Sequence, residues 1–150
     1  MTQNTEEISP TVSIVIPSYR RPDDLHRCLS ALQSQDYRNW EALVVCRTDD
    51  TPNRTYVADF KVLDSRFREV SVEEPGLIAA MNIGLRAATG EFVTFTDDDA
   101  EAPPDWLATI VQHFYEHPEC GGIGGPDRLQ VDKDHLRNPP IANKVGRFSY

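Results

Sequence analysis

The chain has 150 residues, a length that suits one ordinary domain and leaves no room for two full ones. Acidic residues outnumber basic ones by 24 to 15, giving a net charge of -9 at pH 7, which argues against nucleic acid or an anionic membrane as the main partner. No stretch approaches about 18 consecutive apolar residues, and the N-terminus is polar, so we expect neither a membrane span nor a secretory signal. The 3 widely spaced cysteines indicate a reducing, cytoplasmic location.

Strands and helices are expected to alternate from residue 11 onward, after an N-terminal arm, residues 1–10, that lacks periodicity and is expected to be disordered. Val12–Ile16 is β-branched and apolar and predicts a buried strand ending at Pro17. Pro22 then begins a helix to about Gln35, with apolar residues at i, i+3, i+4 and i+7. The later strands are expected at Trp40–Cys46, Phe67–Val72, Glu91–Thr96 and Cys120–Gly125. Two of the later helices are expected at Pro52–Leu63 and at Leu77–Ala88, the second with Gly90 as its C-cap. The last helix is expected from Pro103 onward, and its apolar face consists of Trp106, Ile110, Val111 and Phe114.

This alternation predicts an α/β fold with a mainly parallel sheet in three α/β/α layers. Sheets of this kind bind ligands beyond the carboxyl ends of their strands, at a topological switch point. Four loops qualify by position, namely residues 17–21, 47–53, 73–76 and 97–102.

The acidic run Asp97, Asp98 and Asp99 directly follows the fourth expected strand. Two unit charges about 4 Å apart repel by about 1 kcal/mol in water and about 4 kcal/mol at an effective dielectric constant of 20, so three adjacent carboxylates require an explanation. A hard divalent cation such as Mg²⁺ or Mn²⁺ provides one, because it prefers oxygen ligands. The alternative is a solvated acidic loop at the start of the next helix. The position directly after a buried strand favours the metal site.

Three segments resemble the N-terminal part of family 2 glycosyltransferases with the GT-A fold. They are Val12–Tyr19 with the following helix Asp24–Leu29, Gly84–Val93, and Phe95–Asp99 followed by Pro104–Leu107. Together they span about residues 11–125, and their order and spacing argue against a chance match. The resemblance implies that residues 11–150 are the donor-binding portion of a GT-A domain, truncated so that its C-terminal acceptor portion is missing.

The resemblance implies an inverting transfer of a sugar from a nucleotide-diphosphate donor, commonly a UDP-sugar, to the hydroxyl of a glycan, lipid or small-molecule acceptor. Asp97 and Asp99 are the implied ligands of Mn²⁺ or Mg²⁺, and Asp97 or Asp98 would face the ribose or sugar of the donor. Such a cation would neutralise the charge that develops on the departing diphosphate.

The same resemblance implies nucleotide contacts in the loops after the first two strands, with Tyr19 able to stack on a pyrimidine. The sequence departs from the family pattern twice. Arg47 stands where relatives often carry an acid that reads the base, a role that Asp49 or Asp50 could take instead. Met81 stands where many relatives have an arginine. The predicted nucleotide-binding residues are Pro17, Ser18, Tyr19, Arg47, Asp49, Asn82, Asp97 and Asp98.

The general base of the family lies well downstream of the acidic motif, so it is expected beyond Tyr150. Asp127 is a weaker candidate, because a Gly-Pro-Asp turn explains it equally well. We therefore expect a fragment of a longer enzyme, which could be inactive by itself. Two alternatives are a domain that binds a nucleotide sugar without transferring it and, less favoured because residues 17–21 contain no glycine, a sugar nucleotidyltransferase. A homo-oligomer, and membrane association through the missing portion, stay open.

Overall fold

The computed structural model describes residues 12–126. Residues 12–120 belong to one compact unit, whereas residues 121–126 belong to a second unit and contain no helix or strand. The predicted N-terminal arm and Asp127 lie outside the described residues.

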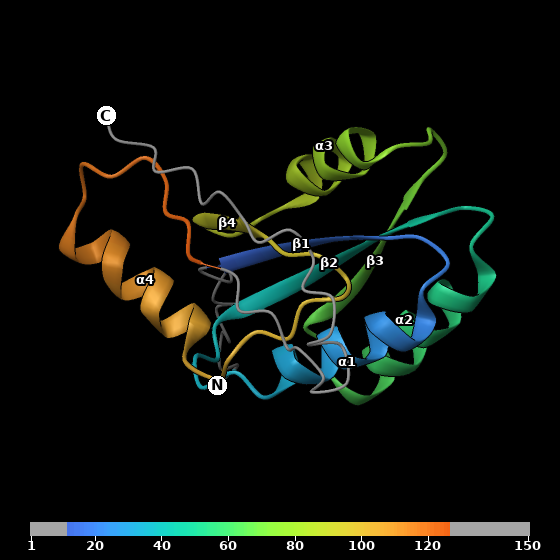
Figure 1. The fold of residues 1–150 in the computed structure, drawn as a ribbon, viewed down its shortest axis with the longest axis horizontal. Helices are drawn as coiled ribbons and strands as arrows, with labels where there is room; N and C mark the ends of the chain where they lie inside the picture. Colours follow the sequence, from blue (N-terminus) through green and yellow to red (C-terminus); the bar gives the residue numbers. More distant parts are fainter. Residues whose placement is uncertain (1–11, 127–150) are drawn as a thin grey trace, which may run out of the picture. The chain divides into compact units, whose positions relative to one another are not determined.

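The sheet has four parallel strands, β1 (Val12–Ser18), β2 (Trp40–Arg47), β3 (Phe67–Val72) and β4 (Phe92–Phe95). Their order is β3-β2-β1-β4 (Figure 1). The chain proceeds outward from β1 to β3 and then returns to the other side of β1 to form β4. The topological switch point therefore lies between β1 and β4, where a ligand site is expected.

Helices cover both faces of this sheet, which confirms the three predicted layers. Helices α1 (Pro22–Gln33), α2 (Thr51–Leu63) and α4 (Trp106–Glu116) pack on one face, and α3 (Leu77–Ala87) packs on the other (Figure 1). Side chains of β1 alternate between the two cores, so that Ile14 and Ile16 face α1 while Val15 faces α3. Within residues 12–126, no helix has the length and apolar character needed to cross a membrane.

Helix α3 lies close to the sheet because Gly84 has no side chain. A Cβ atom at this position would come within 2.3 Å of Val15 Cγ1. The predicted C-cap at Gly90 is wrong. The helix ends at Ala87 with the extended residue Ala88 as its C-cap, and Gly90 instead lies against β1, where a Cβ atom would be 2.7 Å from the Ser13 backbone nitrogen.

The last two predicted elements need correction. The expected strand Cys120–Gly125 is wrong, because residues 120–126 contain no strand. Glycine weakens a strand through its backbone entropy and its lack of a side chain to pack, and this short segment contains several. The final helix begins at Trp106 instead of Pro103. Val111 of the predicted apolar face is buried and Trp106 is partly buried against the same core, and the helix also buries Leu107, which the prediction did not include. The buried Gln35 accepts a hydrogen bond from the Leu107 nitrogen at 3.1 Å, so a side chain from another segment satisfies a donor at the start of α4.

Candidate functional site at the carboxyl ends of the strands

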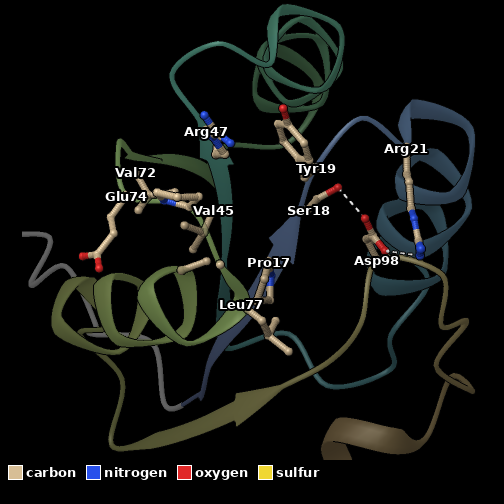
Figure 2. Close-up of a pocket in the computed structure, with 13 residues that line it drawn as sticks. Pro17, Ser18, Tyr19, Arg21, Val45, Arg47, Val72, Glu74, Leu77 and Asp98 are labelled. Atoms are coloured by element: carbon tan, nitrogen blue, oxygen red, sulfur yellow. Dashed lines mark hydrogen bonds and ion pairs between the residues drawn. The ribbon is translucent and has the colours of Figure 1, made fainter.

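A cavity of about 460 Å³ opens at the carboxyl ends of the strands (Figure 2). Residues at or just beyond the ends of β1, β2, β3 and β4 contribute to its wall, and the start of α3 closes one side. The location agrees with the one predicted from the strand and helix alternation. The lining residues are Pro17, Ser18, Tyr19, Arg21, Val45, Arg47, Val72, Glu74, Pro75, Gly76, Leu77, Ala80 and Asp98.

Ser18 and Asp98 meet at the topological switch point. The Ser18 hydroxyl, at the end of β1, donates a hydrogen bond of 2.6 Å to Oδ2 of Asp98, which follows β4. Asp98 is only 6% exposed, and Arg21 Nη1 lies 3.5 Å from its other carboxylate oxygen (Figure 2). One wall of the cavity is therefore a buried carboxylate held by a hydroxyl and faced by a guanidinium group.

Burial raises the pKa of Asp98 above its ordinary value, although the Ser18 hydrogen bond and the Arg21 charge oppose this rise. The neighbouring carboxylates Asp99 and Asp24 add to the rise. The protein thus keeps a carboxylate in a place where its charge is only partly compensated. A carboxylate with a raised pKa on the wall of a cavity is a candidate functional residue.

Asp97 and Asp99 are exposed on either side of Asp98. Arg21 Nη1 lies 3.3 Å from Asp99 Oδ2, whereas the Asp97 side chain has no hydrogen bond or ion pair within the described part of the chain. No group of three or more potential ligands among His, Cys, Asp and Glu comes together in residues 12–126. Two accessible carboxylates do fit the way Mg²⁺ is usually bound, by one or two protein carboxylates together with phosphate oxygens of a substrate.

The wall opposite Asp98 carries Tyr19 and Arg47 (Figure 2). The guanidinium carbon atoms of Arg47 and Arg20 each lie 4.9 Å from the centre of the Tyr19 ring. Asp49 joins the group, since its carboxylate lies 3.2 Å from Arg47 Nε and 3.5 Å from the Tyr19 hydroxyl. This wall offers an aromatic ring and a guanidinium group, which suit stacking on a base and hydrogen bonds to its carbonyl oxygens.

The start of α2 supplies two buried polar residues. Asp50 was an alternative to Asp49 for reading the base, whereas Asn53 was not predicted for the site. Asp50 is the N-cap of α2 and accepts a hydrogen bond from the Asn53 nitrogen at 3.4 Å. The Asn53 side chain donates a hydrogen bond of 2.7 Å to the Ser18 hydroxyl, and both Asp50 and Asn53 are fully buried. The signal available in the sequence was the cap pattern, an acid followed by proline, which marks a helix start but not its partner.

Cys28 lies behind the acidic loop on the buried face of α1, with its sulfur 3.5 Å from the Asp97 carbonyl oxygen. Burial, followed by repulsion from Asp98 and Asp99, raises the pKa of this thiol to about 12. The thiol is therefore protonated at neutral pH and packs as a small apolar group instead of acting as a nucleophile.

The structure brings most of the predicted nucleotide-binding residues together. Pro17, Ser18, Tyr19, Arg47 and Asp98 line the cavity, and Asp49 contacts two of them. Asn82 is exposed on α3 and does not line the cavity, so its predicted contact with the nucleotide stays a prediction. The roles of Asp97 and Asp99 as metal ligands also stay predictions.

The fold and the location of this site define the class as an α/β protein of the GT-A type. The family model described as "Glycosyl transferase family 2" matches residues 13–148. The chain therefore belongs to glycosyltransferase family 2, as its motifs predicted.

Named relatives of this chain are glycosyltransferases as well. The chain is 28% identical over 117 residues to the glycosyltransferase GlyA of Streptococcus pneumoniae, covering 78% of this chain and 17% of GlyA. It is 38% identical over 92 residues to WfgD of Escherichia coli, a UDP-Glc:alpha-D-GlcNAc-diphosphoundecaprenol beta-1,3-glucosyltransferase, covering 59% of this chain and 34% of WfgD.

The structure of the mannosyltransferase PcManGT from Pyrobaculum calidifontis in complex with GDP-Man and Mn²⁺ superimposes with a TM-score of 0.62 at 29% identity. The match covers 72% of this chain and 33% of that chain. The chain thus spans about a third or less of the length of these three proteins.

Proposed function

We propose that this chain binds a nucleotide-diphosphate sugar, in the first instance a UDP-sugar, as the donor-binding part of an inverting glycosyltransferase. The acceptor would supply the hydroxyl group that takes the sugar. A glycan or lipid-linked acceptor is consistent with relatives such as WfgD, whose name describes a diphosphoundecaprenol acceptor.

The observation that carries the proposal is the contact between Ser18 and Asp98 at the switch point, on the wall of the cavity. The charge of Asp98 is held next to a cavity large enough for part of a nucleotide, with Tyr19 and Arg47 across from it. A base would stack on the Tyr19 side, and the ribose hydroxyls would hydrogen-bond to the Asp98 carboxylate. This arrangement directs the phosphates toward Asp97 and Asp99.

Asp97 and Asp99 are the residues that would hold Mn²⁺ or Mg²⁺ in this proposal, together with the diphosphate of the donor. When bound, the cation supplies Lewis acidity and neutralises charge on the leaving diphosphate. Arg21 contributes a positive charge next to Asp98 and Asp99, which also favours phosphate. The choice of divalent cation is supported by PcManGT, which was solved with Mn²⁺.

Calorimetric titration of the 150-residue chain with the UDP, GDP and dTDP conjugates of a sugar, each with and without Mn²⁺, tests the proposal. We expect binding of at least one conjugate, strengthened by Mn²⁺. Binding of none of them in the presence of Mn²⁺ would contradict the proposed donor site.

The Asp99→Ala variant tests the role of the acidic loop separately. We expect it to lose the enhancement by Mn²⁺ and to keep its fold, because Asp99 is exposed and its ion pair with Arg21 is at the surface. Asp105→Ala is the matched control, since it removes an exposed acid from the same segment without touching Asp97 to Asp99. If Asp99→Ala retains the enhancement, the acidic loop is only a helix-capping segment.

A further inference from the structure

Asn53 is a fully buried amide in the first turn of α2, outside the set of residues that line the cavity. Its Nδ2 donates a hydrogen bond of 2.7 Å to the Ser18 hydroxyl oxygen. Its Oδ1 has no hydrogen-bond partner within residues 12–126. The bond to Ser18 is thus the polar contact that accounts for an amide at a buried position where an apolar side chain would bury more favourably.

The donor and acceptor roles in this chain of contacts follow from the chemistry of the groups. An ionised carboxylate can only accept, so at 2.6 Å the Ser18 hydroxyl must donate its single proton to Asp98. The Ser18 oxygen is then left as an acceptor, and the group that faces it must donate. The Asn53 amide nitrogen donates to this oxygen, so the Ser18 hydroxyl proton can point only toward Asp98.

We propose that Asn53 is a positioning residue of the donor site. Its hydrogen bond to the Ser18 oxygen directs the Ser18 proton to Asp98 and so fixes the orientation of the carboxylate that lines the cavity. The inference rests on the proposed function, because it adds a residue to the same site. Asn53 acts only through Ser18 and does not itself contact the donor.

Asp50 holds Asn53 in the position that this role requires. One carboxylate oxygen of Asp50 accepts from the Asn53 nitrogen, and the other accepts from the Arg20 nitrogen at 2.6 Å. Arg20 adopts a left-handed backbone conformation with φ of 57°, which an ordinary residue adopts only when its surroundings hold it there. The same carboxylate therefore fixes the start of α2 and the exit from β1, so the amide and the hydroxyl keep their relative positions.

The test is the affinity of the full 150-residue chain for UDP and for GDP, each with Mn²⁺, measured by calorimetry at a temperature where circular dichroism shows every variant to be folded. Asn53→Ala is expected to weaken nucleotide binding about tenfold, the scale of one lost hydrogen bond to a charged network. Val57→Ala is the matched control, because it truncates another buried residue of α2, one that packs in the hydrophobic core, and it should bind as the wild type does.

Coupling to Ser18 separates positioning from a general loss of stability. Ser18→Ala should also weaken binding. Asn53→Ala introduced into the Ser18→Ala chain should have no further effect on binding, because the hydroxyl that links Asn53 to Asp98 is already absent. If the alanine variant does not fold, Asn53→Asp replaces it, since this change keeps the side-chain shape and removes the donor.

The outcomes distinguish the two proposals. If the wild-type chain binds neither nucleotide, the proposed function fails. If the wild type binds and the Asn53 variants bind equally well, the positioning role is wrong. Additive effects of the Asn53 and Ser18 changes, or an equal loss in Val57→Ala, would also overturn it.

Discussion

The two ends of β1 carry serines in two polar networks that look alike and behave differently. At the amino end, Ser13 donates to Glu41 at 2.7 Å, and the nitrogens of Thr89 and Gly90 donate to the Ser13 hydroxyl oxygen. At the carboxyl end, Ser18 donates to Asp98 and accepts from Asn53. Each network joins β1 to the chain on either side of β4.

The difference lies in how completely each carboxylate is compensated. Burial raises the pKa of Glu41, but hydrogen bonds from Ser13, Thr89 and Arg68 outweigh this and leave the pKa below its ordinary value. Burial dominates at Asp98, and its pKa stays above the ordinary value. The amino-end network therefore stabilises the ionised form of its carboxylate, whereas the carboxyl-end network leaves the charge of Asp98 only partly compensated, which agrees with the donor site proposed above.

The largest expected effect on stability is at Glu41. Glu41→Ala removes the shared acceptor of Ser13, Thr89 and Arg68. Because the Ser13 hydroxyl is fully buried, the loss of this acceptor together with the other two hydrogen bonds should lower the free energy of unfolding by about 2–3 kcal/mol. Urea denaturation at pH 7 measures this change. Glu73→Ala removes the same charge from an exposed position and should change little. Equal stability of the two variants would mean that the amino-end network is not a structural one.

Gly90→Ala tests the close approach of the backbone to Ser13 in the same network. We expect a smaller loss of stability than for Glu41→Ala. A Cβ atom at Gly90 would lie 2.7 Å from the Ser13 nitrogen and 2.9 Å from its hydroxyl oxygen, so the loop must move away from β1. We expect a loss of about 2 kcal/mol in the free energy of unfolding, seen as a lower urea midpoint. At Gly121 an added Cβ atom meets no atom of residues 12–126 within 4 Å, so Gly121→Ala should show no such loss. An unchanged midpoint for Gly90→Ala would contradict the close approach.

The sequence predicted the fold better than it predicted these networks, for a physical reason. The apolar runs of β1 to β4 and the spacing of Leu25, Cys28, Leu29 and Leu32 are local signals, and the structure confirms them. The acidic loop and the cavity were also predictable, because the carboxyl ends of parallel strands meet at one edge of the sheet. The predicted C-cap at Gly90 failed because its close neighbour, Ser13, is 77 residues away in the chain.

The roles of Asn53 and Glu41 could not be predicted for the same reason. Each depends on a partner from another strand or helix, Ser18 for Asn53 and Ser13 for Glu41, and no local pattern marks such a pair. The difference between the two serines emerges only when the hydrogen bonds of both ends of β1 are compared.

The smallest expected change in the free energy of unfolding is at Asp98, where the substitution should stabilise the protein instead of destabilising it. A carboxyl group whose pKa is raised by folding contributes stability that is present below its ordinary pKa of 3.8 and is lost as the pH rises through the raised pKa. Asp98→Asn removes the buried charge, and the ion pair it loses with the exposed Arg21 is worth little. We therefore expect this variant to be more stable than the wild type at pH 7 by about 1 kcal/mol, while it binds nucleotide more weakly.

Urea denaturation as a function of pH compares the two ends of β1 directly. The advantage of Asp98→Asn over the wild type should grow as the pH rises from 4 towards 7, because the wild-type carboxylate becomes charged in that direction. The contribution of Glu41 has the opposite dependence, since its lowered pKa means that its stabilisation is present above 4.5 and is lost as the pH falls through the lowered value. The deficit of Glu41→Ala should therefore shrink in acid. Parallel pH profiles for the two variants would show that both carboxylates are equally compensated, and the distinction between a structural and a ligand-binding end of β1 would not hold.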